Sequence, residues 1–103
     1  MINLSIKPYD YFLVHCEQII GREEDDFWMY VSMCEVKETD PLFVEGVAVI
    51  KQAKSDVHAK MTSLYNEGVF QSFARVDKYL YQRYLNRVSD LCRIFLKREG
   101  YSN

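Results

Sequence analysis

The sequence predicts an α+β fold in which an N-terminal antiparallel β-meander of three or four strands is followed by two α-helices, the last one long. Three segments of the first half are rich in aromatic and β-branched residues and are joined by short polar loops, as in antiparallel hairpins. Apolar residues of the last third recur every three or four positions, which is the period of one helix face. The length of 103 residues, with 49% hydrophobic and 27% charged residues, suits one domain spanning residues 1–103.

The first half is expected to contain three strands. The loops between them contain Gly, Pro and charged residues, a composition and length typical of hairpin connections. Ile2, Leu4 and Ile6 alternate with polar residues, so residues 2–6 are the candidate fourth strand. The three main strands are residues 11–20, 27–36 and 42–50.

An all-helical bundle is the alternative, because the same half also carries helical spacing. Apolar residues between Tyr9 and Ile20 fall on one helix face, with Pro8 and Gly21 placed as start and stop. The acidic residues 23–26 would then lie at the amino end of a second helix, where the helix dipole favours them. We weigh residue composition and loop length above this periodicity, so the β-meander is the prediction.

Two helices are predicted in the second half. The shorter comprises residues 55–65, with Ser55 as its N-cap candidate. The longer comprises residues 69–98 and would be about 45 Å long at 1.5 Å per residue. Gly100 can supply its left-handed cap. The residues expected on its buried face are Phe73, Val76, Leu80, Tyr84, Val88, Leu91 and Phe95.

Charge is divided along the chain. Residues 1–48 contain three basic and ten acidic residues, a net charge of −7, whereas residues 49–103 contain ten basic and five acidic residues, a net charge of +5. The two parts sum to the formal net charge of −2. Because such fields steer association more than they stabilise folds, the acidic half is the expected contact surface for a basic partner.

The acidic and aromatic run between residues 23 and 30 is the primary candidate site. Carboxylates steer the encounter with a basic surface, and a large aromatic side chain supplies the buried contact. The sequence therefore predicts a small protein-interaction factor (an adaptor, inhibitor, chaperone or immunity-type factor) that binds a partner protein with a basic surface. Its expected contact residues are Glu23, Glu24, Asp25, Asp26, Trp28 and Tyr30.

Nucleic acid is the alternative partner and would bind the cationic face of the last helix. Arginine and tyrosine contact phosphates and stack on bases, but a chain with a pI near 5.6 lacks the usual basic footprint. A homodimer is a further possibility, because Tyr79, Tyr81 and Tyr84 offer more aromatic surface than two helices bury. The residues of the cationic face are Arg75, Lys78, Tyr79, Arg83, Arg87, Arg93 and Lys97.

No enzymatic, cofactor or metal role is expected. The sequence contains no glycine-rich phosphate loop, no nucleophile elbow and no His-Glu-x-x-His motif. Cys16, Cys34 and Cys92 are an odd number of cysteines without metal-ligand spacing, which indicates reduced thiols and a cytoplasmic location. The N-terminus lacks signal-peptide features. No membrane helix is expected, because the longest apolar run, residues 27–31, is far shorter than the ~20 residues that a membrane helix needs.

Overall fold

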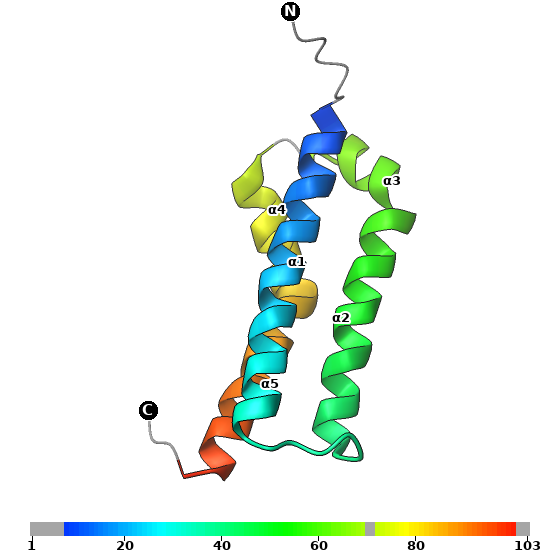
Figure 1. Ribbon diagram of the computed structural model, residues 1–103. Coiled ribbons are helices and arrows are strands. Elements are labelled where there is room, and N and C mark those ends of the chain that lie inside the picture. Colours follow the sequence, from blue (N-terminus) through cyan, green and yellow to red (C-terminus); the bar gives the residue numbers. More distant parts are fainter. Residues whose placement is uncertain (1–7, 70–71, 101–103) are drawn as a thin grey trace, which may run out of the picture.

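The computed structural model describes residues 8–69 and 72–100, and every regular element within these ranges is a helix (Figure 1). The predicted β-meander is therefore wrong, and the all-helical bundle weighed as its alternative is the observed fold. The candidate fourth strand, residues 2–6, lies outside the described residues.

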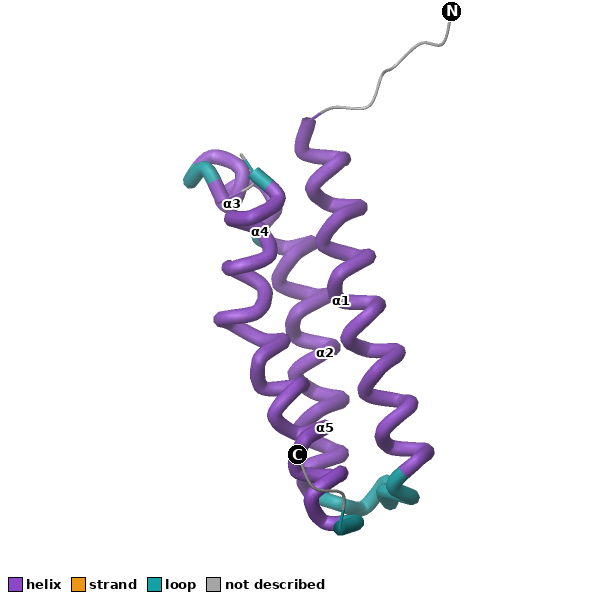
Figure 2. The backbone as a smooth tube through the Cα atoms, turned by 90° about the vertical axis from the view of Figure 1, so that its left-hand side faces the viewer, coloured by secondary structure: helices purple, strands orange, loops and turns teal. Residues whose placement is uncertain are grey.

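Three long helical segments form the bundle. A wide π-helical turn, Tyr81–Leu85, joins α4 to α5, so residues 73–98 form one continuous helix. α1 and α2 run antiparallel, and the continuous helix packs against both, while the short α3 lies at one end of the bundle (Figures 1 and 2). The helices are α1 (Pro8–Met33), α2 (Pro41–Ala59), α3 (Met61–Asn66), α4 (Phe73–Leu80) and α5 (Asn86–Arg98).

α1 contains the predicted strand 11–20, most of the predicted strand 27–36 and the loop expected between them. Its fully buried side chains, among them Cys16, Ile20 and Phe27, follow the helical period. Strand preference depends on context, so burial of a helical face overrides the β-branched and aromatic composition. Gly21, expected to stop a helix, lies inside α1. The acidic residues 23–26 therefore occupy about one helical turn, from which their side chains point in different directions.

α2 contains the predicted strand 42–50 and much of the predicted helix 55–65. The carboxylate of Asp40 caps it by accepting a hydrogen bond from the Leu42 N–H at 2.9 Å, and Pro41 occupies the first turn. Ser55 lies within the helix rather than at its start. Between α1 and α2, Glu35 has a φ of 51°, the left-handed conformation in which chains often leave a helix.

The long C-terminal helix is present, although it begins at Phe73 rather than at residue 69. The Ser72 hydroxyl caps it by accepting a hydrogen bond from the Arg75 N–H at 3.1 Å. Gly100 follows its end with a φ of 85°, as the left-handed cap requires. Phe73, which was expected in the core, is 50% exposed. The buried face therefore begins at Val76.

The wide turn follows from the spacing of the buried residues. Val76, Leu80, Tyr84 and Val88 are all buried and recur every four positions. Each step of four exceeds the 3.6-residue period by roughly 40° of rotation, so a regular helix would carry this stripe away from the core. A π turn holds more residues per turn. It takes up the drift and buries Tyr84 beside Leu85.

Phe27 lies at the centre of the core. Its ring centroid is 6.0 Å from that of Phe43 on α2 and 6.1 Å from that of Phe95 on α5. Gly46 of α2 faces the same ring, and a Cβ at this position would overlap it. The absence of a side chain at Gly46 is therefore what lets α1 and α2 approach each other closely.

Candidate functional site

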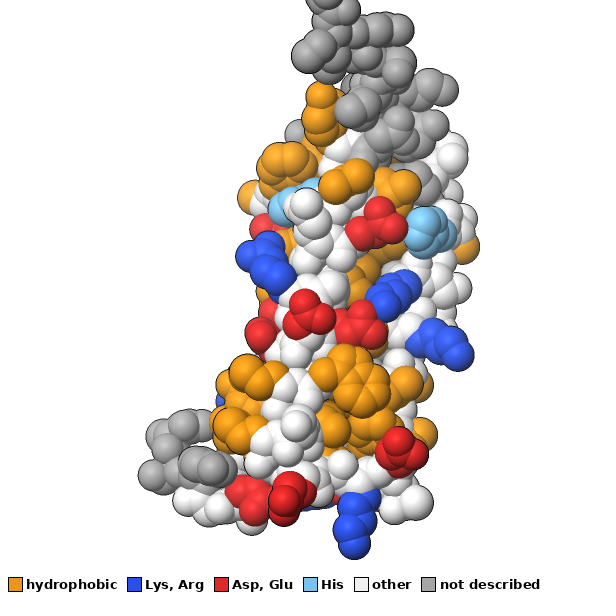
Figure 3. All heavy atoms as spheres, in the orientation of Figure 1, with side chains coloured by type: hydrophobic (Ala, Val, Ile, Leu, Met, Phe, Trp, Pro, Cys, Tyr) orange, Lys and Arg blue, Asp and Glu red, His pale blue; other side chains and the backbone are white. Residues whose placement is uncertain are grey.

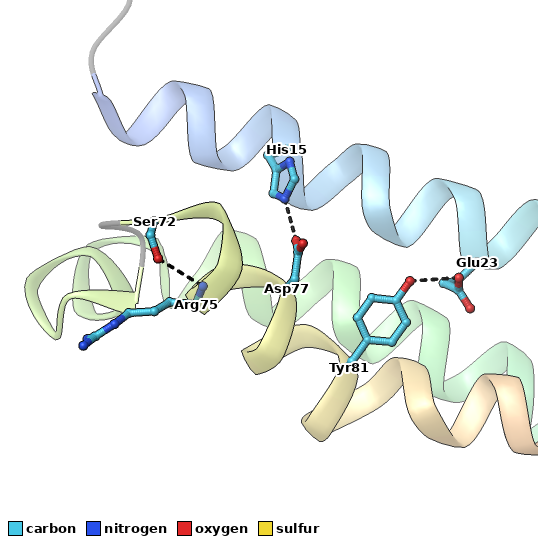
Figure 4. Close-up of polar contacts among 6 residues, drawn as sticks. All are labelled: His15, Glu23, Ser72, Arg75, Asp77 and Tyr81. Carbon is cyan, nitrogen blue, oxygen red and sulfur yellow. Dashed lines mark hydrogen bonds and ion pairs between the residues drawn. The ribbon is translucent and has the colours of Figure 1, made fainter.

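The four predicted acidic contact residues divide into two pairs. Glu23 is half-buried and accepts hydrogen bonds from the Tyr81 hydroxyl at 3.0 Å (Figure 4) and from the Ser89 hydroxyl at 3.1 Å. Glu24 forms an ion pair of 2.6 Å with Lys54. Burial, followed by the hydrogen bond to Glu23, raises the pKa of Tyr81 above its usual value. Glu23 and Glu24 therefore bind other helices of their own chain.

Asp25 and Asp26 are exposed and have no hydrogen-bond or ion-pair partner among the described residues. Trp28 is 45% exposed, and its ring packs edge-on against Phe27 and Phe43 at centroid distances of 5.9 and 5.5 Å. Tyr30 is half-buried against the core. Of the two predicted aromatic anchors, Trp28 is therefore the exposed one and Tyr30 the partly buried one.

Two contact candidates were missed by the sequence reasoning. Met29 and Met33 are 51% and 48% exposed, one turn apart on the outer face of α1. They follow Asp25 at intervals of four residues, which places all three on one side of a helix. We call Asp25, Asp26, Met29 and Met33 the α1 ridge. The sequence contains the i, i+4, i+8 spacing of Asp25, Met29 and Met33, but this spacing places residues on one face only if the segment is helical.

A groove runs between α1 and α2. It consists of two adjoining cavities of about 310 and 240 Å³, which share Glu24 and Lys54 in their linings. Glu17 and His58 lie across the first cavity with 3.7 Å between their side-chain N and O atoms. The first cavity is lined by Glu17, Ile20, Gly21, Glu24, Lys54, Val57 and His58. The second is lined by Glu24, Trp28, Val47, Ile50, Lys51 and Lys54.

His15 and Asp77 make a second polar contact between α1 and the continuous helix. His15 Nε2 lies 2.6 Å from Asp77 Oδ1 (Figure 4). The His15 ring stacks on Phe73 with 4.3 Å between centroids. The adjacent Cys16 is fully buried, and burial, with a smaller effect of the Asp77 charge, raises the pKa of its thiol to about 12. The thiolate is the reactive form of cysteine, so this raised pKa argues against Cys16 as a nucleophile. The contact between His15 and Asp77 serves to join α1 to the continuous helix.

The predicted cationic face is partly neutralised by carboxylates. The Arg87 guanidinium donates two hydrogen bonds to Glu45 of α2, at 2.5 and 2.9 Å, and Arg93 pairs with Asp90. Arg83 stacks over the ring of Tyr79 at 4.9 Å. Arg75, Lys78 and Lys97 are exposed. The seven residues therefore do not present a uniform basic stripe.

The tyrosines expected to drive dimerisation are largely used within the chain. Tyr84 is buried, and its hydroxyl donates to Asp56 of α2 at 2.5 Å. Tyr81 bonds Glu23, and Tyr79 packs partly against the core. The surplus of aromatic surface that favoured a dimer through this helix is therefore small.

Opposite charges from the two halves of the sequence also form ion pairs with each other within the chain. Lys54 pairs with Glu24, Arg87 with Glu45, and Arg98 donates to Asp40 at 2.5 Å. Much of the division of charge seen in the sequence is thus satisfied between helices. Within the acidic run of residues 23–26, the charges without an internal partner are those of Asp25 and Asp26.

Comparison with protein-family models, with curated proteins and with solved structures finds no match to this chain. Within the part of the chain that the structure describes, no three His, Cys, Asp or Glu side chains are grouped so as to hold a metal ion. The helices of residues 8–69 and 72–100 include none with both the length and the apolar character needed to cross a bilayer.

Proposed function

We propose that this protein is a small protein-interaction factor that uses the α1 ridge to bind a partner protein. The observation that carries the proposal is the pair of half-exposed methionines, Met29 and Met33, beside two carboxylates, Asp25 and Asp26, that have no partner among the described residues. Methionine side chains are flexible and polarisable, which suits surfaces that bind by adapting to another protein. The ridge therefore combines an apolar contact with a charge that steers the encounter.

The partner expected from this chemistry has an apolar cleft bordered by lysine or arginine. A helix ridge with apolar residues one turn apart inserts into a groove of another protein, and the flanking carboxylates meet its basic rim. An adaptor, inhibitor, chaperone or immunity-type factor would each act by covering a partner's surface in this way. The proposal includes a cytoplasmic location, which the free thiols of Cys16, Cys34 and Cys92 support.

Binding to nucleic acid through the continuous helix has less support. Arg87 and Arg93 would have to leave Glu45 and Asp90 before they could contact phosphates. We therefore retain protein binding as the proposed function.

A comparative capture experiment tests the proposal. The full chain is immobilised, exposed to extract of the native host at low and high salt, and the retained proteins are quantified by mass spectrometry. The double variant Met29→Ser/Met33→Ser and the single variant Asp26→Lys should each lose a protein that the unmodified chain retains, by roughly tenfold or more. Higher salt should weaken its retention, because the steering charges are exposed.

The matched control is Glu67→Lys, which makes the same charge reversal at an exposed position after α3. It should retain the same proteins as the unmodified chain. If both ridge variants retain every protein in unchanged amounts, the ridge is not the binding surface.

A further inference from the structure

Two stripes of residues border the groove between α1 and α2. Their spacing alternates between three and four, and none of their members is buried. The core-facing residues of α1 and α2 form separate sets. A second stripe with this spacing is typical of a helix that packs against neighbours on two sides, as in four-helix bundles. The acidic stripe on α1 is Glu17, Gly21, Glu24 and Trp28, and the basic stripe on α2 is Val44, Val47, Lys51, Lys54 and His58.

The two stripes match each other at three levels. Because α1 and α2 are antiparallel, Glu17 lies opposite His58 and Glu24 lies opposite Lys54. At the other end, Trp28 lines the same cavity as Val47. Figure 3 looks onto this face: charged side chains of both signs lie across its middle, and hydrophobic side chains gather below them. At these three levels an acidic or aromatic side chain on α1 lies opposite a basic or aliphatic one on α2.

We infer that this groove binds a second copy of the chain, related by a two-fold axis that runs along the groove. This axis keeps every level at its own height and places α1 of each copy over α2 of the other. The acidic stripe then meets the basic stripe, and Trp28 of each copy meets Val44 and Val47 of the other. A two-fold axis across the helices would instead set α1 on α1, with acidic residues facing each other.

One pair of charges identifies this arrangement. Lys51 lines the groove from α2, and Asp25 is the exposed neighbour of Glu24, which lines the groove from α1; Asp25 and Lys51 both lack an ion-pair partner among the described residues. In the two-fold dimer, Asp25 of each copy lies at the level of Lys51 of the other, so two identical ion pairs form. Trp28 and Val44, which are 45% and 55% exposed, are covered at the same time.

The inference goes beyond the proposed function because it concerns a different face of α1. Met29 and Met33 of the α1 ridge do not line the groove. A dimer formed through the groove would therefore leave both methionines accessible to another protein. Asp25 is the one residue that the two surfaces share.

Sedimentation equilibrium of the full chain at several concentrations tests the dimer by charge reversal. The unmodified chain should approach twice its mass of 12.2 kDa as concentration rises. Asp25→Lys and Lys51→Glu should each weaken the dimer by roughly tenfold or more, because each sets like charges together at two places. An equimolar mixture of the two variants should restore a dimer, since both contacts then carry opposite charges.

Asp26→Lys is the matched control. Asp26 lines a different cavity, toward α5, so reversing its charge should leave the dimer unchanged even though it weakens partner binding. A mass of 12.2 kDa at every concentration, or a dimer that neither Asp25→Lys nor Lys51→Glu weakens, overturns the inference. Far-UV circular dichroism of each variant verifies that it is folded. Because Lys51→Glu leaves the α1 ridge intact and Met29→Ser/Met33→Ser leaves the groove intact, the dimer and the proposed function fail separately.

Discussion

α1 packs against its two neighbours in different ways. Toward the continuous helix it uses hydrogen bonds between partly buried side chains: His15 with Asp77, and Glu23 with Tyr81 and Ser89. Toward α2 it uses the Phe27 ring against Gly46, and its charged pairs with α2 lie in the groove above the core.

This difference indicates which contacts set the position of one helix along the other and which contacts set the distance between the helices. A hydrogen bond is directional, so each partly buried pair fixes where one helix lies along the other. Contact between a ring and a glycine is apolar and non-directional. It lets two helices approach closely but does not fix where one lies along the other. Substitutions on the two sides of α1 should therefore lower the free energy of unfolding by different amounts.

The largest effect is expected on the α2 side, from Gly46→Ala. The new Cβ overlaps the fully buried Phe27 ring, and this overpacking exceeds the gain in helix propensity. We expect a net loss of about 1–2 kcal/mol in the free energy of unfolding, measured by urea denaturation.

Gly21→Ala is the control for that substitution. It makes the same change inside α1, where an added Cβ meets nothing within 4 Å, and should raise the free energy of unfolding by about 0.5–1 kcal/mol. Equal gains for both glycines would show that α1 and α2 do not approach each other at Gly46.

A smaller effect is expected when the neighbouring glutamates are compared. Glu23→Ala leaves the hydroxyls of Tyr81 and Ser89 without their acceptor and should cost about 1 kcal/mol. Glu24→Ala removes an ion pair whose Lys54 is half-exposed, and should cost no more than about 0.5 kcal/mol. Thermal or urea unfolding of both variants measures the difference. A larger loss for Glu24→Ala would mean that the α1–α2 side depends on its ion pairs.

The smallest effect is a dependence on pH where α2 meets the continuous helix. Hydrogen bonding from Tyr84 holds the pKa of Asp56 below its ordinary value of 3.8. The stability that Asp56 contributes is therefore complete above its unfolded pKa and is lost as pH falls through its lower folded pKa. Asp56→Asn keeps an oxygen for the Tyr84 hydroxyl but does not titrate. Between about pH 5 and pH 2, its thermal midpoint should fall less than that of the unmodified chain; equal slopes would contradict this assignment.

The same contrast explains what could be predicted from the sequence. The continuous helix has one buried face, so residues from Val76 to Phe95 revealed its period directly. α1 carries apolar side chains toward the core and also toward solvent, where Trp28, Met29 and Met33 lie. The helical period of α1 is therefore hidden within an unbroken apolar run, and the composition of this run favoured a strand.

The candidate site was predictable only in part, for a related reason. Asp25 and Asp26 are exposed, as a local reading of the acidic run suggests. The partners of Glu23 and Glu24 lie on other helices, and no local pattern could identify Tyr81, Ser89 or Lys54 as those partners. The groove likewise depends on the pairing of α1 with α2, which follows from tertiary structure.

The wide turn between α4 and α5 is a place where the chain can lose a residue. Because the π turn takes up the rotation of about one extra residue, deleting one residue from Tyr81–Leu85 should restore an ordinary helix and leave α4 and α5 facing the core as before. The same deletion in α5, between Val88 and Leu91, would rotate all that follows by about 100° and turn Leu91 and Phe95 out of the interior. In this molecule, the continuous helix tolerates a missing residue at its wide turn and not in its regular part.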